Sequence, residues 1–159
     1  MDIDENKLRR ISKGFRRAIE ETDFSEASVG TEGHARMSGF PHGACAEATT
    51  LLGIYLTKDH SVSPLVEVIA QMVKDGIWLG SHHWLEYNEI VIDITADQFA
   101  MVSDPVIVSN QSDFHLNCAE QVYKNPSAFR LENQQEWMMR LYDAIVKCVR
   151  KFAVASGGG

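Results

Sequence analysis

The hairpin predicted between residues 77 and 95 constrains the fold more than any other feature of the sequence. Two strand-like segments, "IWLGSHHWLEY" and "IVIDIT", are separated only by Asn88 and Glu89. Two such segments joined by two residues predict an antiparallel β-hairpin with a tight turn. The resulting register pairs Tyr87 with Ile90, Leu85 with Ile92, Trp84 with Asp93 and His82 with Thr95. The middle of the chain is therefore predicted to lie in an antiparallel sheet.

The two faces of this hairpin differ in chemistry, because successive side chains point to opposite sides of a strand. One face is nearly all apolar and carries His83, Leu85, Tyr87, Ile90, Ile92 and Ile94. The other face is mixed and carries His82, Trp84, Glu86, Val91, Asp93 and Thr95. On the mixed face His82 lies diagonally across from Asp93, a separation that two side chains can bridge. A three-residue loop would give that place to His83, but the hydrophobic pattern favours His82.

Apolar spacing and turn residues predict the remaining elements. They are helices over 5–21, 45–57, 64–75 and 132–154, a surface loop over 22–43, and a strand over 105–109. The 64–75 helix depends on Pro64 in its first turn, on an apolar stripe that includes Val68 and Met72, and on Gly76 as its end. The order is helices, then antiparallel strands, then a closing helix, which predicts an α+β fold.

Size and charge narrow the class of protein. The chain has 159 residues and a formal net charge of −7. We expect a single domain over 1–155, a flexible Gly-rich tail over 156–159, and no nucleic-acid binding, which needs basic surface. The basic stretch "KLRRISKGFRR" is typical of the solvated face of a helix. An acidic N-terminus and the lack of a long apolar run predict a cytoplasmic protein without membrane contact, although an exported effector or toxin would look the same.

Among the three cysteines, Cys45 is the candidate nucleophile. An odd number of cysteines, without CxxC or a zinc-type Cys/His quartet, favours a reducing compartment. Cys148 falls on the apolar face of the closing helix, and Cys118 has no obvious chemical partner. Cys45 stands where a glycine-containing turn becomes a helix, and a helix N-terminus lowers the pKa of a thiol. The alternative is a structural residue, because free cysteine is among the most buried residue types.

Three short motifs resemble those of a known superfamily. They are "GACAEA" at 43–48, "HHWLE" at 82–86 and "DIT" at 93–95. In this order they resemble the motifs of the transglutaminase-like branch of the papain-like cysteine enzymes, which read approximately G-x-C-x-x-A, H-x-W-x-E and D-x-T. The match spans residues 40 to about 98. The resemblance implies a papain-like core in which the Cys-bearing helix packs on an antiparallel sheet, and the predicted helix over 132–154 would close the domain.

The resemblance also implies a catalytic triad. Cys45 would be the nucleophile, His82 the general base and acid, and Asp93 the group that orients His82. The superfamily includes transglutaminases, proteases, deamidases and peptide glycanases, which act on amide or related acyl bonds. We therefore expect a thiol-dependent hydrolase or acyltransferase with a protein or peptide substrate; hydrolysis, deamidation and cross-linking stay open. The alternative is a catalytically idle member of the same fold that binds a protein partner.

Several residues are candidates for binding the substrate or the oxyanion. No Gln stands shortly before Cys45, where papain itself has its oxyanion donor, so the backbone N–H of Cys45 is the first candidate. The further candidates are Trp84, Glu86, Gln98 and His42. His82, His83 and Glu86 are of zinc-binding type, but adjacent strand residues point to opposite faces. We therefore expect no metal and no cofactor.

Two further expectations concern the rest of the chain. The predicted helix over 64–75 lies between Cys45 and His82, where many members of the superfamily have a strand. The remaining histidines, His34, His42, His60 and His115, fall in predicted loops and have no assigned role, apart from the candidacy of His42. The oligomeric state stays open.

Overall fold

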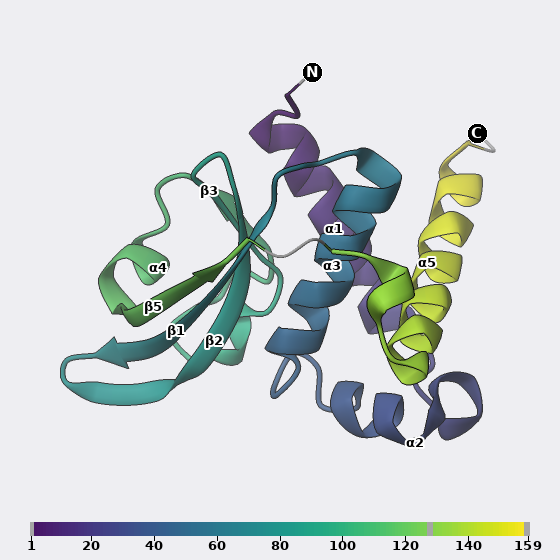
Figure 1. The fold of residues 1–159 in the computed structure, drawn as a ribbon, viewed down its shortest axis with the longest axis horizontal. Helices are drawn as coiled ribbons and strands as arrows, with labels where there is room; N and C mark the ends of the chain where they lie inside the picture. The colour runs from purple at the N-terminus through teal and green to yellow at the C-terminus, as the bar shows by residue number, and fades with distance from the viewer. Residues whose placement is uncertain (1, 127–128, 158–159) are drawn as a thin grey trace.

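Within residues 2–126 and 129–157, which the computed structural model describes, the chain forms five α-helices and a five-stranded sheet (Figure 1). The helices are α1 (Glu5–Glu21), α2 (Glu26–Met37), α3 (Cys45–His60), α4 (Asp113–Cys118) and α5 (Glu136–Gly157). The strands are β1 (Val66–Lys74), β2 (Ile77–Tyr87), β3 (Ile90–Asp93), β4 (Ile107–Ser109) and β5 (Ala119–Asn125). Two short 3-10 helices complete the chain, η1 (Ala96–Gln98) and η2 (Leu131–Asn133). The predicted α+β class is confirmed.

The sheet has the strand order β4-β3-β2-β1-β5, and every neighbouring pair is antiparallel. Figure 1 shows α1, α3 and α5 gathered on one side of the sheet and α4 on the other. The larger hydrophobic cluster joins those three helices and α2 to one face of the sheet, through side chains such as Phe15, Leu51, Leu85 and Leu141. A smaller cluster, which includes Val68, Met72, Trp84 and Cys118, lies on the opposite face. The central strands thus have apolar clusters on both faces, whereas most of edge strand β5 is exposed.

The predicted hairpin and its register are confirmed near the turn, but the described ladder ends at Leu85–Ile92, so the predicted pairs Trp84–Asp93 and His82–Thr95 are not part of it, and β3 ends at Asp93. Tyr87 pairs with Ile90 and Leu85 with Ile92, so the connection is the two-residue turn at 88–89. Asn88 and Glu89 have φ values of 47° and 66°, the left-handed pair that matches the twist of the flanking strands. Leu85 belongs to the larger cluster and Trp84 to the smaller one, so the predicted alternation of faces is also confirmed.

The predicted helix over 64–75 is wrong, because Val66–Lys74 is strand β1. Val68, Ala70 and Met72 are buried at two-residue spacing, which is the period of a strand. The other face of β1 is only half-buried but also apolar in part, and this gave the segment an apparent helical stripe. Pairing with β2 on one side and β5 on the other decided the outcome, since a central strand satisfies its backbone through both neighbours.

The predicted loop over 22–43 is wrong in its central part, which forms α2. Its backbone is kinked at Gly30, which has a φ of 80°, and after the kink the buried residues Gly33 and Met37 are four residues apart. A Cβ at Gly33 would meet Val29 at 3.2 Å and Leu141 of α5 at 3.3 Å, so glycine permits the close packing of α2 on α5. Tertiary packing therefore outweighs the low helix propensity of this glycine-containing segment.

The remaining boundaries follow the predictions with small shifts. Helix α3 extends three residues beyond the predicted end at 57, and α5 begins at Glu136 rather than 132. Of the predicted tail over 156–159, residues 156 and 157 lie in α5, and residues 158 and 159 lie outside the described residues. No helix in the described part of the chain is long and apolar enough to cross a membrane.

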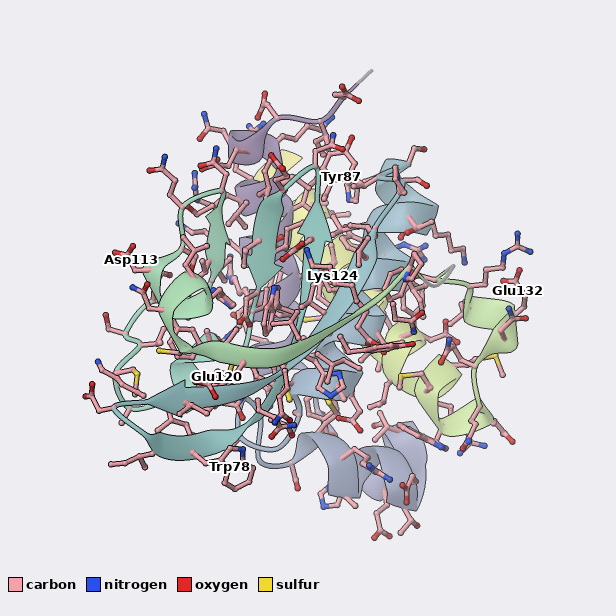
Figure 2. The ribbon with its side chains drawn as sticks, turned by 60° about the vertical axis from the view of Figure 1, so that its left-hand side comes forward. Trp78, Tyr87, Asp113, Glu120, Lys124 and Glu132 are labelled. Atoms are coloured by element: carbon pink, nitrogen blue, oxygen red, sulfur yellow. The ribbon has the colours of Figure 1, made fainter. Side chains whose placement is uncertain are left out.

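The β1–β2 hairpin extends away from the helices, and Trp78 near its turn is 64% exposed (Figure 2). Its indole N–H donates a hydrogen bond of 2.8 Å to Gln71. The opposite end of β2 is buried under α3, so one strand carries both an exposed tip and a buried segment. The candidate site lies on the buried segment.

Candidate active site

Cys45 is the first residue of α3, as the sequence predicts. Gly43 has a φ of 71°, a conformation that glycine adopts without strain, and it turns the chain into the helix. Ala44 is fully buried and its carbonyl accepts the first helical hydrogen bond, from Ala48. The half-buried thiol of Cys45 therefore stands at the positive end of a four-turn helix, where negative charge is stabilised.

Strand β2 lies across the first turn of α3. The Thr49 hydroxyl donates to the backbone carbonyl of His83, with an Oγ1–O distance of 3.2 Å. Cys45 is one helical turn before Thr49, and the neighbouring His82 and His83 lower the pKa of its thiol. The packing of a helix terminus on a strand thus brings residues 45 and 82 together.

His82 and Asp93 form a buried pair. The Nε2–H of His82 donates to Oδ2 of Asp93 at 2.6 Å, and the two residues are 0% and 2% exposed. Burial disfavours the imidazolium, but the charge and hydrogen bond of Asp93, with a smaller contribution from Cys45, raise the pKa of His82 to about 9. The sequence prediction that His82, and not His83, lies beside Asp93 is therefore correct.

The Cys45 thiol is activated by its neighbours. Burial alone would raise its pKa, but the hydrogen bond and charge of His82, together with the charge and backbone N–H of His83, lower the pKa below its ordinary value. A lowered pKa for the thiol and a raised pKa for the imidazole extend the pH range in which thiolate and imidazolium coexist. The arrangement therefore favours a charged, nucleophilic sulfur.

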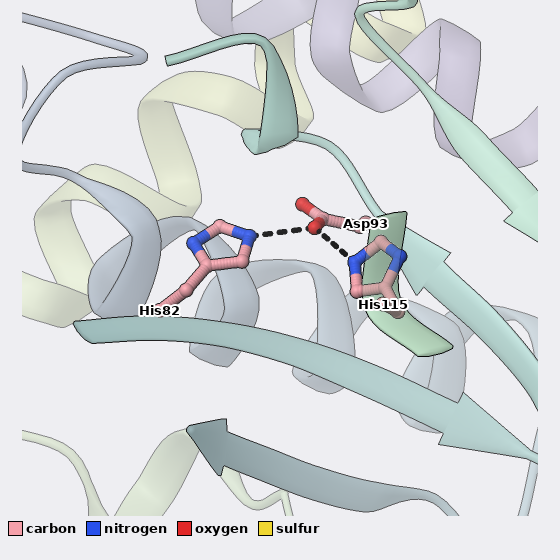
Figure 3. Close-up of side chains that lie close together, drawn as sticks. All are labelled: His82, Asp93 and His115. Carbon is pink, nitrogen blue, oxygen red and sulfur yellow. Dashed lines mark hydrogen bonds and ion pairs between the residues drawn. The ribbon is translucent and has the colours of Figure 1, made fainter. Parts of the chain in front are cut away.

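Asp93 remains ionised although it is buried. Its Oδ1 accepts from the backbone N–H of Thr95 at 2.9 Å and from the Thr95 hydroxyl at 3.4 Å. Its Oδ2 accepts from His82 and from a second imidazole, that of His115, at 2.8 Å (Figure 3). The charge of His82 and the hydrogen bonds from His115 and His82 outweigh burial and hold the pKa of the Asp93 carboxyl well below its usual range.

Gln98, a predicted candidate for binding the substrate or the oxyanion, lies beside His82. Its Nε2 is 2.9 Å from Nδ1 of His82, the ring nitrogen that does not face Asp93. The amide N–H donates to this nitrogen when His82 is neutral. When His82 is protonated, Nδ1–H is itself a donor, so the Gln98 N–H no longer bonds this nitrogen.

A buried arginine fixes the short helix that carries Gln98. Arg16 of α1 makes a bidentate ion pair with Asp97, at 2.7 and 2.9 Å, and donates to the carbonyl of Ile94 at 2.7 Å. Its guanidinium also stacks on Phe40, with 4.8 Å to the ring centroid. Arg16 thus connects η1 with the chain that leads into the Cys45 turn.

The other predicted binding residues are not all brought to the thiol. The buried Trp84 ring lies 5.8 Å from that of His82, and within residues 2–126 and 129–157 its Nε1 has no hydrogen-bond partner. Glu86 accepts from Lys124 of β5 at 2.9 Å, on the edge strand where Lys124 is labelled in Figure 2. His42 is exposed in the turn before Cys45. Gln98 is therefore the best placed of the four candidates.

His115 is the residue that sequence reasoning missed. It was expected in a loop without a role, but it lies on α4 and hydrogen bonds Asp93. His34 and His60 were also expected in loops and lie in α2 and α3. Nothing in the sequence places His115 beside Asp93, because 22 residues and strand β4 separate them.

The cluster of His82, Asp93 and His115 has ligand atoms within 4.8 Å of one another and is of zinc-binding type. The nitrogens lie 2.6 and 2.8 Å from the same carboxylate oxygen, which are hydrogen-bond distances. Tetrahedral zinc, with bonds of roughly 2.0–2.1 Å, keeps its ligand atoms about 3.3 Å apart. The observed spacing fits shared protons better than a shared ion.

A second imidazole–carboxylate pair lies on the other face of β2. His83 Nδ1 is 3.8 Å from Oε2 of Glu67, beyond hydrogen-bond distance, and the neighbouring Glu67 carboxylate raises the pKa of His83. Burial acts in the opposite direction, and the charge of Cys45 adds to the rise. Two imidazoles therefore stand within electrostatic reach of one thiol.

Comparisons with protein-family models, with curated proteins and with solved structures found no match to the chain. The chemistry of the site is thus the basis for the function.

Proposed function

We propose that the protein is a cysteine-dependent acyl-transfer enzyme that acts on amide bonds of proteins or peptides through a thioester on Cys45. The observation that carries the proposal is the buried His82–Asp93 pair, 2.6 Å apart, on strands that pack at the start of α3, where His82 lowers the pKa of the Cys45 thiol. A thiol at a helix N-terminus, beside an imidazole oriented by a carboxylate, has the parts that nucleophilic catalysis needs.

Acylation follows from the charges of the resting site. The Cys45 thiolate attacks the amide carbonyl carbon, a C–S bond forms and the C–N bond breaks. The leaving nitrogen takes the proton from Nδ1 of the His82 imidazolium and departs as ammonia or an amine. Asp93 keeps Nε2–H of His82 in place throughout, so the ring presents the same nitrogen to the substrate.

In deacylation His82 acts as the general base and the Cys45 sulfur is the leaving group. Neutral His82 takes a proton from water or from a second amine, whose oxygen or nitrogen bonds to the thioester carbon. The C–S bond breaks and the sulfur leaves as thiolate, which restores the thiolate–imidazolium pair. Water as the acceptor gives hydrolysis or deamidation, and an amine gives cross-linking.

Two donors support stabilisation of the oxyanion. The backbone N–H of Cys45 is in the first turn of α3, where backbone N–H groups have no partner within the helix. The Gln98 amide beside Nδ1 of His82 is the second donor, since protonation of His82 frees its N–H group. Gln98 would then serve the role that papain assigns to a Gln before the nucleophile.

A papain-like arrangement is part of the proposal. Cys45 on a helix, His82 on β2 and Asp93 on β3 follow in the order of the transglutaminase-like motifs. The chain has strand β1 between Cys45 and His82, where many members of the superfamily also have a strand. The helix expected over 64–75 would have differed from that pattern. The net charge of −7 favours basic segments of the substrate.

The test compares two cysteines in one molecule. Iodoacetamide alkylation of Cys45 and of half-buried Cys148 is followed by mass spectrometry against pH. At about pH 6 a thiol of ordinary pKa is less than 1% ionised, so we expect Cys45 to react at least ~30-fold faster than Cys148. Incubation with a Gln-containing peptide and a fluorescent primary amine should then release ammonia or label the peptide, and Cys45→Ala should abolish both while Cys148→Ala does not.

Equal reactivity of Cys45 and Cys148 at this pH would contradict the proposal. A folded wild-type protein with an unreactive Cys45 would instead be a binding module with a papain-like fold, the alternative that the sequence leaves open. An unfolded Cys45→Ala protein would indicate a structural cysteine.

A further inference from the structure

We infer that His115 is a positioning residue of the candidate active site: its Nε2–H shares one oxygen of Asp93 with His82 and holds that carboxylate in place. This inference rests on the proposed function, which it deepens. His115 does not contact Cys45 in any described interaction and acts through Asp93.

The geometry around Asp93 is that of a carboxylate held from two sides. Figure 3 shows the His82 and His115 rings on either side of Asp93, with both Nε2 atoms directed at it. The His115 contact is 2.8 Å, and the ring itself is fixed by Ser112, whose Oγ lies 2.6 Å from Nδ1. Because Ser112 can donate to Nδ1, His115 is able to donate from Nε2 while it is neutral.

The burial of this group explains why a second imidazole is needed. A carboxylate that is 2% exposed has lost its water and depends on protein donors for its charge. While His82 is an imidazolium, it supplies both a donor and a positive charge. After His82 gives its proton to the leaving group, Asp93 loses the positive charge of His82 and keeps its hydrogen bonds from His115, Thr95 and His82. His115 is therefore most important in the state where His82 is neutral.

This difference fixes the direction of the effect on His82. Loss of the His115 donor destabilises Asp93 more when His82 is neutral than when it is charged, so the pKa of His82 rises. His82 would then hold its proton more strongly and release it less readily. Cys45 and His83 interact electrostatically with His82, and Glu86, Glu89 and Lys124 line the cavity beside His115; none of them changes in the variants below.

Two substitutions separate the donor from the volume of the ring. His115→Phe keeps an aromatic ring and removes the N–H, whereas His115→Gln keeps an N–H donor. Nitrogen-15 NMR of labelled histidine follows the protonation of His82 against pH, and the upper inflection of Cys45 alkylation by iodoacetamide follows it independently. We expect His115→Phe to raise the pKa of His82 by about half a unit to one unit, and His115→Gln to restore most of the wild-type value. Replacement of the distant His60 by Phe is the control and should leave the pKa of His82 unchanged.

A rescue experiment uses the space beside His115. A surface cavity of about 440 Å³ is lined by His115, Ser112 and Trp84, among others. In His115→Gly, added imidazole should enter this space, donate to Asp93 and return the pKa of His82 towards the wild-type value.

A pKa of His82 that is unchanged or lower in folded His115→Phe would overturn the inference, and so would a rise that His115→Gln shares in full. These outcomes leave the proposed function intact if wild-type Cys45 still reacts faster than Cys148. The proposed function fails separately, if wild-type Cys45 shows no enhanced reactivity.

Discussion

Adjacent residues of β2 carry two histidine–carboxylate pairs that differ in burial and in spacing. His82 is fully buried, with Nε2 2.6 Å from Asp93. His83 is only half-buried, with Nδ1 3.8 Å from Glu67. Both imidazoles lower the pKa of the Cys45 thiol, and His82 contributes more than His83.

The difference shows how a strand gives two identical side chains different chemistry. Alternation sends His82 and His83 to opposite faces, and the faces have different neighbours. On the buried face a charge interaction is weakly screened and strong, and on the partly exposed face water competes with it. We therefore expect the two pairs to respond very differently to matched substitutions.

The largest effect is expected from His82→Ala, with His83→Ala as the matched change. Loss of His82 removes the hydrogen bond and the nearest positive charge from the thiolate, so alkylation of Cys45 by iodoacetamide at about pH 6.5 should fall ~100-fold. His83→Ala removes only a distant charge and should reduce the rate less than ~3-fold. Equal losses in the two variants would place both imidazoles at the thiol and remove the distinction.

Asp93→Asn should have the next largest effect. Without the carboxylate, burial dominates, and the pKa of His82 should fall from about 9 to below its ordinary value of 6.5. The imidazolium is then lost at neutral pH, so Cys45 alkylation at about pH 7.5 should decrease ~10-fold. NMR titration of His82 measures the pKa directly. A pKa that stays near that of wild type would mean that Asp93 does not stabilise the imidazolium.

The third prediction concerns how the free energy of unfolding of Cys45→Ala and of wild type depends on pH. In folded Cys45→Ala, His82 keeps a raised pKa, so it binds a proton that the unfolded chain has lost above 6.5. Its stabilising contribution is complete below that pH and should be lost as the pH rises towards about 9, with a slope of up to about 1.4 kcal/mol per pH unit. In the wild type the thiol releases a proton on folding, which offsets the proton that His82 binds. Urea unfolding between about pH 6.5 and 9 should therefore show a steeper decline for Cys45→Ala than for wild type; parallel curves would argue against a thiolate–imidazolium pair.

Glu67→Gln should give the smallest effect. It removes the carboxylate beside His83, so the pKa of His83 should decrease, because the interaction with Glu67 is the largest cause of its rise. The partly exposed pair of His83 and Glu67 should contribute less than about 1 kcal/mol to the free energy of folding, and the rate of Cys45 alkylation should change less than ~2-fold. A loss as large as that in Asp93→Asn would assign the second pair a direct part in the chemistry.

Much of the site could be predicted because its parts are local in sequence. The two-residue turn at 88–89 fixes the register of β2 and β3, and the register alone places His82 across from Asp93. The glycine-containing turn before Cys45 marks the start of α3 in the same way. Backbone periodicity and turn chemistry operate over a few residues, so they can be read from the sequence.

The parts that could not be predicted depend on contacts between distant segments. The 66–74 segment has apolar residues compatible with either period, and only pairing with β2 and β5 makes it a strand. The 26–37 segment is a helix because Gly33 permits close packing on α5. In both cases the deciding free energy comes from neighbours that the local sequence does not contain.

The sequence by itself determined the α+β class, the hairpin with its two faces, and the identity of Cys45, His82 and Asp93 as candidates. Only the tertiary structure decided that β2 lies across the first turn of α3, that Gln98 reaches Nδ1 of His82, and that His115 shares Asp93. The physical reason is the range of the interactions. Hydrogen bonds and periodicity within an element are set by neighbouring residues, whereas a buried charge acquires its donors from whichever elements pack around it.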